Sequence, residues 1–187
     1  MARLQINGNL ASQNTGISNY AMLEKTIEKV VLCYREYLGY EPIKDIDLYI
    51  DNATQDSGYT PIITSVLDKI LVIKLGIDEN ASEGKIIFQF AHEFMHYIFY
   101  TWNGLNRIVN AEREEPMCVA ASLIILYHLC FDEFAIYNEY VKSLKDRNYQ
   151  KGAEVAQAIG YDFGKFIKFA WKENGGDRQC MLKPMKK

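Results

Sequence analysis

The sequence predicts an α+β protein with a short N-terminal β-sheet and a mainly helical C-terminal half. Apolar and polar residues alternate in short segments between residues 46 and 76, which is typical of strands. From residue 81 to residue 172, apolar residues instead recur at helical spacing. With 187 residues, 49% of them hydrophobic and 24% charged, the chain has the size and composition of one compact domain, expected over residues 1–187.

Periodicity and turn residues place the first elements. A helix is predicted from Ser18 to Leu38, and Gly39 would end it. Isoleucine and leucine alternate with aspartate over residues 46–51, so this segment is expected to be a strand with one face in water. Two β-branched segments, Tyr59–Leu67 and Ile70–Gly76, follow with only two residues between them, which predicts a β-hairpin.

A long helix is predicted from Ala81 to Trp102, with Asn80 or Ser82 as its N-terminal cap and Asn103-Gly104 at its end. Met117–Leu129 is nearly all apolar and is therefore expected to be a buried helix.

Three further helices are predicted over residues 132–145, 152–159 and 162–172. The core of the domain is thus expected over about residues 18–130, with a helical extension over about residues 131–187. Lysines recur at helical spacing in the last of these helices, where a solvated face is expected.

Composition excludes several classes of protein. The net charge of −3 disfavours nucleic acid as the main partner. The cysteines form no CxxC pair and mostly lie in apolar segments, which predicts buried thiols in a reducing, cytoplasmic compartment. The N-terminus lacks the apolar core of a signal peptide. The longest apolar run, Cys118–Phe131, is too short and too interrupted to cross a membrane.

The motif that carries chemistry is His92-Glu93-Phe94-Met95-His96, an HExxH sequence inside the long predicted helix. Residues four apart lie on the same face of a helix, so His92 and His96 can bind one zinc ion. Glu93 lies about 100° around the helix axis, where it is badly placed as a ligand but well placed as a general base for a metal-activated water.

The third ligand is less well determined by the residues alone. Phe99 and Trp102 stand where a metzincin has its glycine and third histidine, so that class is excluded. His128 lies in the apolar helix and is expected to be a hydrogen-bonded core residue. The better ligand candidates are the glutamates of residues 111–116, namely Glu112, Glu114 and Glu115, because a second helix beginning there can cross the first. Alternatively, these glutamates form a solvated first turn.

HEFMH followed by AEREEPMCVAASLIIL resembles the ImmA/IrrE-type zinc metallopeptidases, which are small gluzincins. The resemblance covers about residues 60–126 and implies a minimal zincin-like domain. It also implies His92, His96 and Glu115 as zinc ligands and Glu93 as the catalytic glutamate. The chain departs from the family pattern at Arg113, at Pro116-Met117 and at Val119.

Pro116 favours a helix that starts at or just before it. Such a start would place Glu115 near the helix cap, which keeps Glu112 as a rival ligand.

The sequence therefore predicts a zinc-dependent peptidase that acts on a protein or peptide substrate. The substrate is expected to add as a strand along Ile70–Gly76. A tyrosine could stabilise the oxyanion; the sequence does not specify which one, and Tyr97, Tyr100 and Tyr59 are the candidates near the motif. The alternative is a zinc-containing regulatory or interaction protein of phage or mobile-element type with little proteolysis. The resemblance also implies a repressor-type regulator as a partner.

Overall fold

The computed structural model describes residues 2–7, 17–52, 61–67, 69–77 and 81–174. In these ranges it contains a small mixed sheet and six helices, which confirms the α+β class. The elements are β1 (Leu4–Ile6), α1 (Ile17–Leu38), β2 (Asp47–Asn52), β3 (Ile62–Leu67), β4 (Ile70–Leu75), α2 (Glu83–Asn103), α3 (Ala111–Leu129), α4 (Phe131–Ser143), α5 (Arg147–Ala158) and α6 (Phe163–Glu173). None of the helices in the described part of the chain is long and apolar enough to span a membrane.

The sheet has the strand order β1-β2-β4-β3. Strands β3 and β4 are antiparallel, which confirms the predicted hairpin, although residues 59 and 60 of its expected first strand lie outside the described residues. Strands β1, β2 and β4 are parallel to one another, and β1 was not anticipated from the sequence.

Strand β4 lies inside the sheet, between β2 and β3. Its two hydrogen-bonding edges are therefore both occupied, and the prediction that a substrate adds along Ile70–Gly76 is wrong. The sequence pattern could not show this, because the parallel pairing of β2 with β4 joins segments that are distant in the chain. The edge strand nearest the HExxH helix is instead β3.

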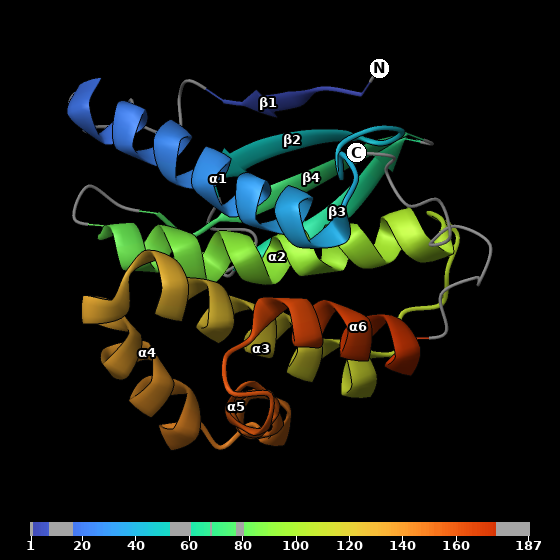
Figure 1. The fold of residues 1–187 in the computed structure, drawn as a ribbon. Helices are drawn as coiled ribbons and strands as arrows, with labels where there is room; N and C mark the ends of the chain where they lie inside the picture. Colours follow the sequence, from blue (N-terminus) through green and yellow to red (C-terminus); the bar gives the residue numbers. More distant parts are fainter. Residues whose placement is uncertain (1, 8–16, 53–60, 68, 78–80, 175–187) are drawn as a thin grey trace.

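Helix α2 packs against β3 and β4 of the sheet and against α1, and α3, α5 and α6 lie on the side of α2 away from the sheet (Figure 1). The buried face of the sheet is formed by Leu48, Ile50, Leu71 and Ile73 of β2 and β4. The alternation of these residues with half-buried ones is the pattern that predicted the strands. Helix α2 thus lies in the middle of the molecule, covered from both sides.

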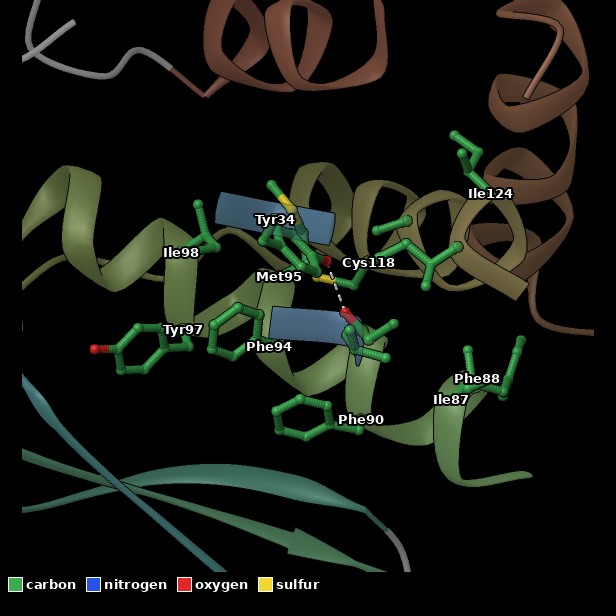
Figure 2. Packing of buried hydrophobic residues seen from close by; sticks show 14 of the residues in the cluster. Tyr34, Ile87, Phe88, Phe90, Phe94, Met95, Tyr97, Ile98, Cys118 and Ile124 are labelled. Carbon is green, nitrogen blue, oxygen red and sulfur yellow. Dashed lines mark hydrogen bonds between the residues drawn. The ribbon is translucent and has the colours of Figure 1, made fainter. Parts of the chain in front are cut away.

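Tyr34 of α1 connects α1 with α2 at the level of the HExxH motif. Its ring packs edge-on against Phe94 and Phe163, at centroid distances of 4.9 and 5.0 Å. Its hydroxyl donates a 2.9 Å hydrogen bond to the carbonyl oxygen of Ala91, the residue before His92 (Figure 2). Because the ring and the hydroxyl are both satisfied, this fully buried tyrosine fixes α1 against α2.

Both ends of α2 are where the sequence predicts them. The Ser82 side chain accepts a hydrogen bond from the Lys85 amide, and Gly104, at φ 82°, ends the helix in a conformation that favours glycine. Glu133 of α4 adds a second cap, because its carboxylate accepts hydrogen bonds from the Ser82 hydroxyl and the Gly84 amide.

Helix α3 begins at Ala111, so the expectation that it starts at or just before Pro116 is wrong. The first turn is held by the amides of Arg113 and Glu114, which both donate to the Asn110 carbonyl. Pro116 lies inside the helix, where it lacks only the one amide hydrogen that would point to the preceding turn. As a consequence, the neighbouring glutamates occupy full helical positions and point in different directions.

Helix α5 begins five residues before the predicted Gly152, at Arg147. It packs closely on α3, because a Cβ atom at Gly152 would lie only 2.5 Å from the Val119 side chain and 2.9 Å from the Pro116 carbonyl. This close approach places Tyr149, in the first turn of α5, beside the HExxH motif. The predicted helices at 132–145 and 162–172 correspond to α4 and α6.

Candidate metal centre

His92 and His96 lie on one face of α2, and their ring centroids are 5.3 Å apart. Both are buried, at 7% exposure, which is unusual for two imidazoles unless polar partners compensate for the lost hydration. Glu93, between them in the sequence, is buried to a similar extent. The local structure expected from the HExxH motif is therefore present.

Glu115 of α3 reaches both histidines. Its Oε2 lies 3.2 Å from His92 Nε2, and its Oε1 lies 3.3 Å from His96 Nε2. Neighbouring ligand atoms around a tetrahedral zinc ion lie about 3.3–3.6 Å apart, so each oxygen of this carboxylate lies about as far from one imidazole nitrogen as a neighbouring zinc ligand would. Burial by itself raises the pKa of Glu115, but hydrogen bonds with the two histidines lower it well below its ordinary value.

Cys118 lies one turn after Glu115 on the same face of α3. Ligand atoms of His92, His96 and Cys118 all lie within 4.8 Å of one another, so this buried group could hold a metal ion. Burial raises the pKa of the Cys118 thiol to about 12. The thiol also packs near Tyr34 and Met95 in the core (Figure 2).

Sequence reasoning identified Cys118 as a buried thiol but missed its place beside the histidines. The spacing of three residues from Glu115 is the signal that could have revealed it.

The two other glutamates of α3 do not contact the pair of histidines in the same way. Glu112 is exposed and forms no ion pair with either histidine, so the structure brings Glu115 rather than Glu112 to the site. Glu114 is buried and forms an ion pair with Arg107, and one of its oxygens lies 3.5 Å from Nδ1 of His96.

His92 and His96 line a cleft with a volume of about 380 Å³. That size falls in the usual range for ligand sites. Its walls are formed by α2, by the start of β3 and the residue before it, and by side chains from α3, α5 and the segment before α3, namely Pro61, Ile62, Ile63, Arg107, Val109, Glu115 and Tyr149. The cleft therefore runs between the edge strand β3 and the HExxH helix.

Glu93 faces this cleft. Burial raises its pKa, the two neighbouring histidines oppose this effect, and a hydrogen bond with the backbone of Ile63 also lowers the pKa. The net shift is upward, which brings the carboxyl group closer to the range useful for a general base. The contact with Ile63 also places this group next to the edge strand.

The tyrosines suggested as oxyanion groups have different positions. Tyr97 points toward the sheet, where its hydroxyl donates a 2.6 Å hydrogen bond to the Ile46 carbonyl, so the expectation for Tyr97 is wrong. Tyr100 lines the cleft, but the Arg107 guanidinium lies over its ring at 4.2 Å. Tyr59 lies outside the described residues.

Tyr149, which the sequence did not single out, lies at the site. Its ring stacks on that of His92, with centroids 6.1 Å apart and planes inclined by 20°. Burial, together with the negative charges of Glu115 and Glu93, raises the pKa of Tyr149 to about 12. The hydroxyl therefore stays protonated near neutral pH and can donate a hydrogen bond into the cleft.

His128 lies in the last turn of α3 rather than in the core. It is exposed, and its Nε2 is 2.8 Å from the carbonyl oxygen of Tyr161. The expectation of a hydrogen bond is confirmed, whereas the expectation of burial is wrong, because the helix ends at Leu129, only one residue later.

Compared with known proteins, the chain matches no family model, no curated protein and no solved structure. The site combines two imidazoles and a thiol that could hold a metal ion with a carboxylate, Glu115, in contact with both imidazoles. A second carboxylate, Glu93, and Tyr149 lie beside them in the cleft.

Proposed function

We propose that this protein is a zinc-dependent peptidase with a zincin-like arrangement of its active-site helix and edge strand. The observation that carries the proposal is the contact of Glu115 with both His92 and His96, at 3.2 and 3.3 Å, beside a buried Glu93. Two histidines and one carboxylate are the ligand set of several catalytic zinc sites, in which the fourth position stays open.

Glu115 suits the role of third ligand better than Cys118. Its side chain is 30% exposed and borders the cleft, so a metal bound between it and the histidines would remain accessible to substrate. Cys118 is fully buried and would approach the metal from the core side. If both bound, the metal would have four protein ligands, which is typical of structural zinc.

This second ligand set supports the alternative function, a regulatory or interaction protein with structural zinc. Cobalt substitution distinguishes the two, because a cysteine ligand adds an intense sulfur-to-cobalt charge-transfer band in the near ultraviolet that histidine and carboxylate ligands do not give. We expect wild type and Cys118→Ser to have the same spectrum. A band present in wild type and lost in Cys118→Ser would favour the structural role.

The residues around the metal would act as follows. When bound, zinc would supply a Lewis acid that polarises the scissile carbonyl and makes a water molecule a stronger nucleophile. Glu93 accepts a proton from the attacking water and passes it to the leaving amine, and its raised pKa suits both steps. Tyr149 donates a hydrogen bond to the oxyanion that develops on the carbonyl oxygen.

Strand β3 is the surface on which a peptide substrate would bind. It is an edge strand, its first residues line the cleft, and the exposed Ile62 lies at its start. An extended peptide can add to such an edge through main-chain hydrogen bonds, which would carry its scissile bond past Glu93 and the histidines. A protein substrate therefore has to present an extended segment, and the resemblance to regulators of mobile elements suggests a repressor-type protein.

The proposal is tested by incubating zinc-loaded protein with an unstructured protein such as β-casein and with a library of quenched fluorescent peptides. We expect cleavage that stops when a chelator removes the metal and returns when zinc is added. A second test co-expresses the protein with a repressor-type protein. If the fully zinc-loaded protein cleaves neither β-casein, nor any peptide of the library, nor the co-expressed repressor-type protein, the structural alternative is favoured.

A further inference from the structure

Glu114 lies between Arg107 and His96 and contacts both. Its Oε1 accepts hydrogen bonds from the Arg107 guanidinium and, at 3.3 Å, from the Asn110 amide. Its Oε2 lies 3.5 Å from His96 Nδ1. These three side chains are all nearly buried, with exposures of 6%, 4% and 9% for those of Arg107, Glu114 and His96. They therefore form a continuous polar row beneath the cleft.

The imidazole of His96 is held between two carboxylates on opposite ring nitrogens. Nε2 faces Glu115 at 3.3 Å, on the side of the candidate metal site, and Nδ1 faces Glu114. Glu114 Oε2 is buried and has no hydrogen bond of normal geometry among the described residues. A separation of 3.5 Å is slightly too long for such a bond, so a small rotation of the imidazole would complete it. An unpaired buried carboxylate oxygen is unfavourable, so the arrangement with this hydrogen bond formed would be favoured.

Arg107 holds Glu114 in this position. Its guanidinium lies over the Tyr100 ring at 4.2 Å and approaches the Phe99 ring at 5.9 Å, so α2 fixes it from one side. The ion pair with Glu114 fixes it from the other side. Arg107 precedes α3 in a segment without regular secondary structure. Its side chain is therefore held in place by these contacts with Tyr100, Phe99 and Glu114.

We propose that Glu114 and Arg107 are positioning residues for His96. Glu114 accepts a hydrogen bond from His96 Nδ1–H and thereby leaves the Nε2 lone pair free for the metal, and Arg107 acts through Glu114. A carboxylate behind a ligating histidine typically increases metal affinity 10–100-fold. The inference rests on the proposed metal centre and assigns a role to two residues that supply no ligand.

Two other roles predict different behaviour. Glu114 could serve only to hold the start of α3 through Asn110, in which case its substitution would weaken folding and leave the intrinsic metal affinity unchanged. Arg107 also borders the cleft, and a direct contact with substrate would raise KM without changing metal affinity.

The test measures zinc dissociation constants by competition with a chromophoric chelator, on protein whose fold is verified by circular dichroism. Glu114→Gln keeps the size of the side chain, but one of its ends becomes an N–H donor. Whichever way the amide turns, either His96 Nδ1–H or Arg107 then faces a donor. We expect zinc affinity to fall 10–100-fold in Glu114→Gln and to stay unchanged in Glu112→Gln, the exposed control in the same turn.

A double-mutant cycle tests whether Arg107 acts on His96 through Glu114. Arg107→Lys is expected to weaken zinc binding, and adding Glu114→Gln should bring the loss only to that of Glu114→Gln alone, because both changes act through one contact. Independent, additive losses would overturn the role of Arg107. Zinc affinity in Glu114→Gln within threefold of wild type would overturn the whole inference.

If Glu114→Gln does not fold, the test rests on Arg107→Lys alone. Unchanged zinc affinity in Arg107→Lys would then contradict the proposed positioning of His96 by Arg107 and Glu114. The outcome remains separate from that of the proposed function, because a wild-type protein that binds no zinc contradicts the metal centre itself.

Discussion

Oε2 of Glu115 lies 3.2 Å from Nε2 of His92, across the interface between α3 and α2. A second oxygen of the same carboxylate lies 3.3 Å from His96, so α3 contributes one group that joins both histidines of α2. Without a metal, such a carboxylate is stabilised by sharing protons with the imidazoles. In the proposed metal centre the same three groups would be the ligands, and the interface between the two helices would then depend on metal binding.

The first prediction concerns the ligands. We expect one zinc ion per chain in protein purified without chelator, and a loss of affinity by orders of magnitude in Glu115→Ala, because this carboxylate contacts both histidines. Glu112→Ala should bind zinc normally, since Glu112 is exposed. Elemental analysis and chelator competition provide the measurements. Equal, small effects of both substitutions would show that another residue completes the site.

The second prediction separates the enzyme from a structural metal protein. Glu93→Gln keeps the shape of the side chain but cannot take a proton near neutral pH. We expect it to fold and to bind zinc, while peptide cleavage falls by roughly 10²–10⁴-fold, the usual weight of a positioned general base. His92→Ala should lose zinc as well as activity. Full activity of Glu93→Gln, measured on the same peptide, is the result that would rule out the proposed mechanism.

The third prediction concerns Tyr149, whose ring lies beside His92. Tyr149→Phe removes only the hydroxyl, so zinc affinity and KM should change little. We expect kcat to fall by about 10²-fold, as for the loss of one oxyanion donor. Tyr140→Phe, at an exposed position of α4, is the control. An unchanged kcat in Tyr149→Phe would exclude the hydroxyl from the reaction.

The fourth prediction concerns pH. Burial lowers the pKa of His96, but contacts with Glu114 and Glu115 of α3 outweigh this effect and hold the pKa well above 6.5. The stability that this imidazolium contributes is complete below about pH 6.5, the unfolded value, and is lost as pH rises through the folded pKa. The pKa of Glu93 is also raised, so the ionisation of this carboxyl group likewise lowers the stability of the folded protein as pH rises. Metal-free protein should therefore become less stable from pH 6.5 to 8.

Zinc should reverse this trend, because it binds the unprotonated imidazole and its stabilisation grows with pH. Urea unfolding of metal-free and zinc-loaded protein at several pH values measures both effects. His128→Gln should keep the pH dependence of the metal-free protein, since His128 lies in the last turn of α3, away from the site. Metal-free stability that rises between pH 6.5 and 8 would contradict the ion pairs around His96.

The fifth prediction concerns the contact between α5 and α3. Alanine normally stabilises a helix relative to glycine. Gly152→Ala should instead destabilise the protein by about 1–3 kcal/mol, because the new Cβ would lie 2.5 Å from Val119. Gly164→Ala in α6 is the matched control, since its nearest neighbour, a ring carbon of Tyr37, is 3.3 Å away. Chemical denaturation that ranks Gly152→Ala as the more stable of the two variants would contradict this packing.

Much of the local structure could be predicted from the sequence. Ser82 and Gly104 mark the ends of α2, and the alternation of apolar residues marks β2 and the β3–β4 hairpin. These features depend on interactions within a few residues, such as a cap or the period of a strand, so the local sequence is sufficient to specify them. The two histidines and Glu93 belong to this group, because one helical turn relates them.

The tertiary structure alone decided which segments meet. The parallel pairing of β2 with β4 left β3 as the edge beside the cleft, and the packing of α5 on α3 brought Tyr149 to His92. Helical periodicity shows which residues share a face, but not which helix that face contacts. The resemblance implied Glu115 as a ligand, but only the packing of α3 on α2 decided that Glu115 rather than Glu112 contacts the histidines. The position of Arg107 behind Glu114 likewise depends on how side chains of several segments fill one core, which a short stretch of sequence does not specify.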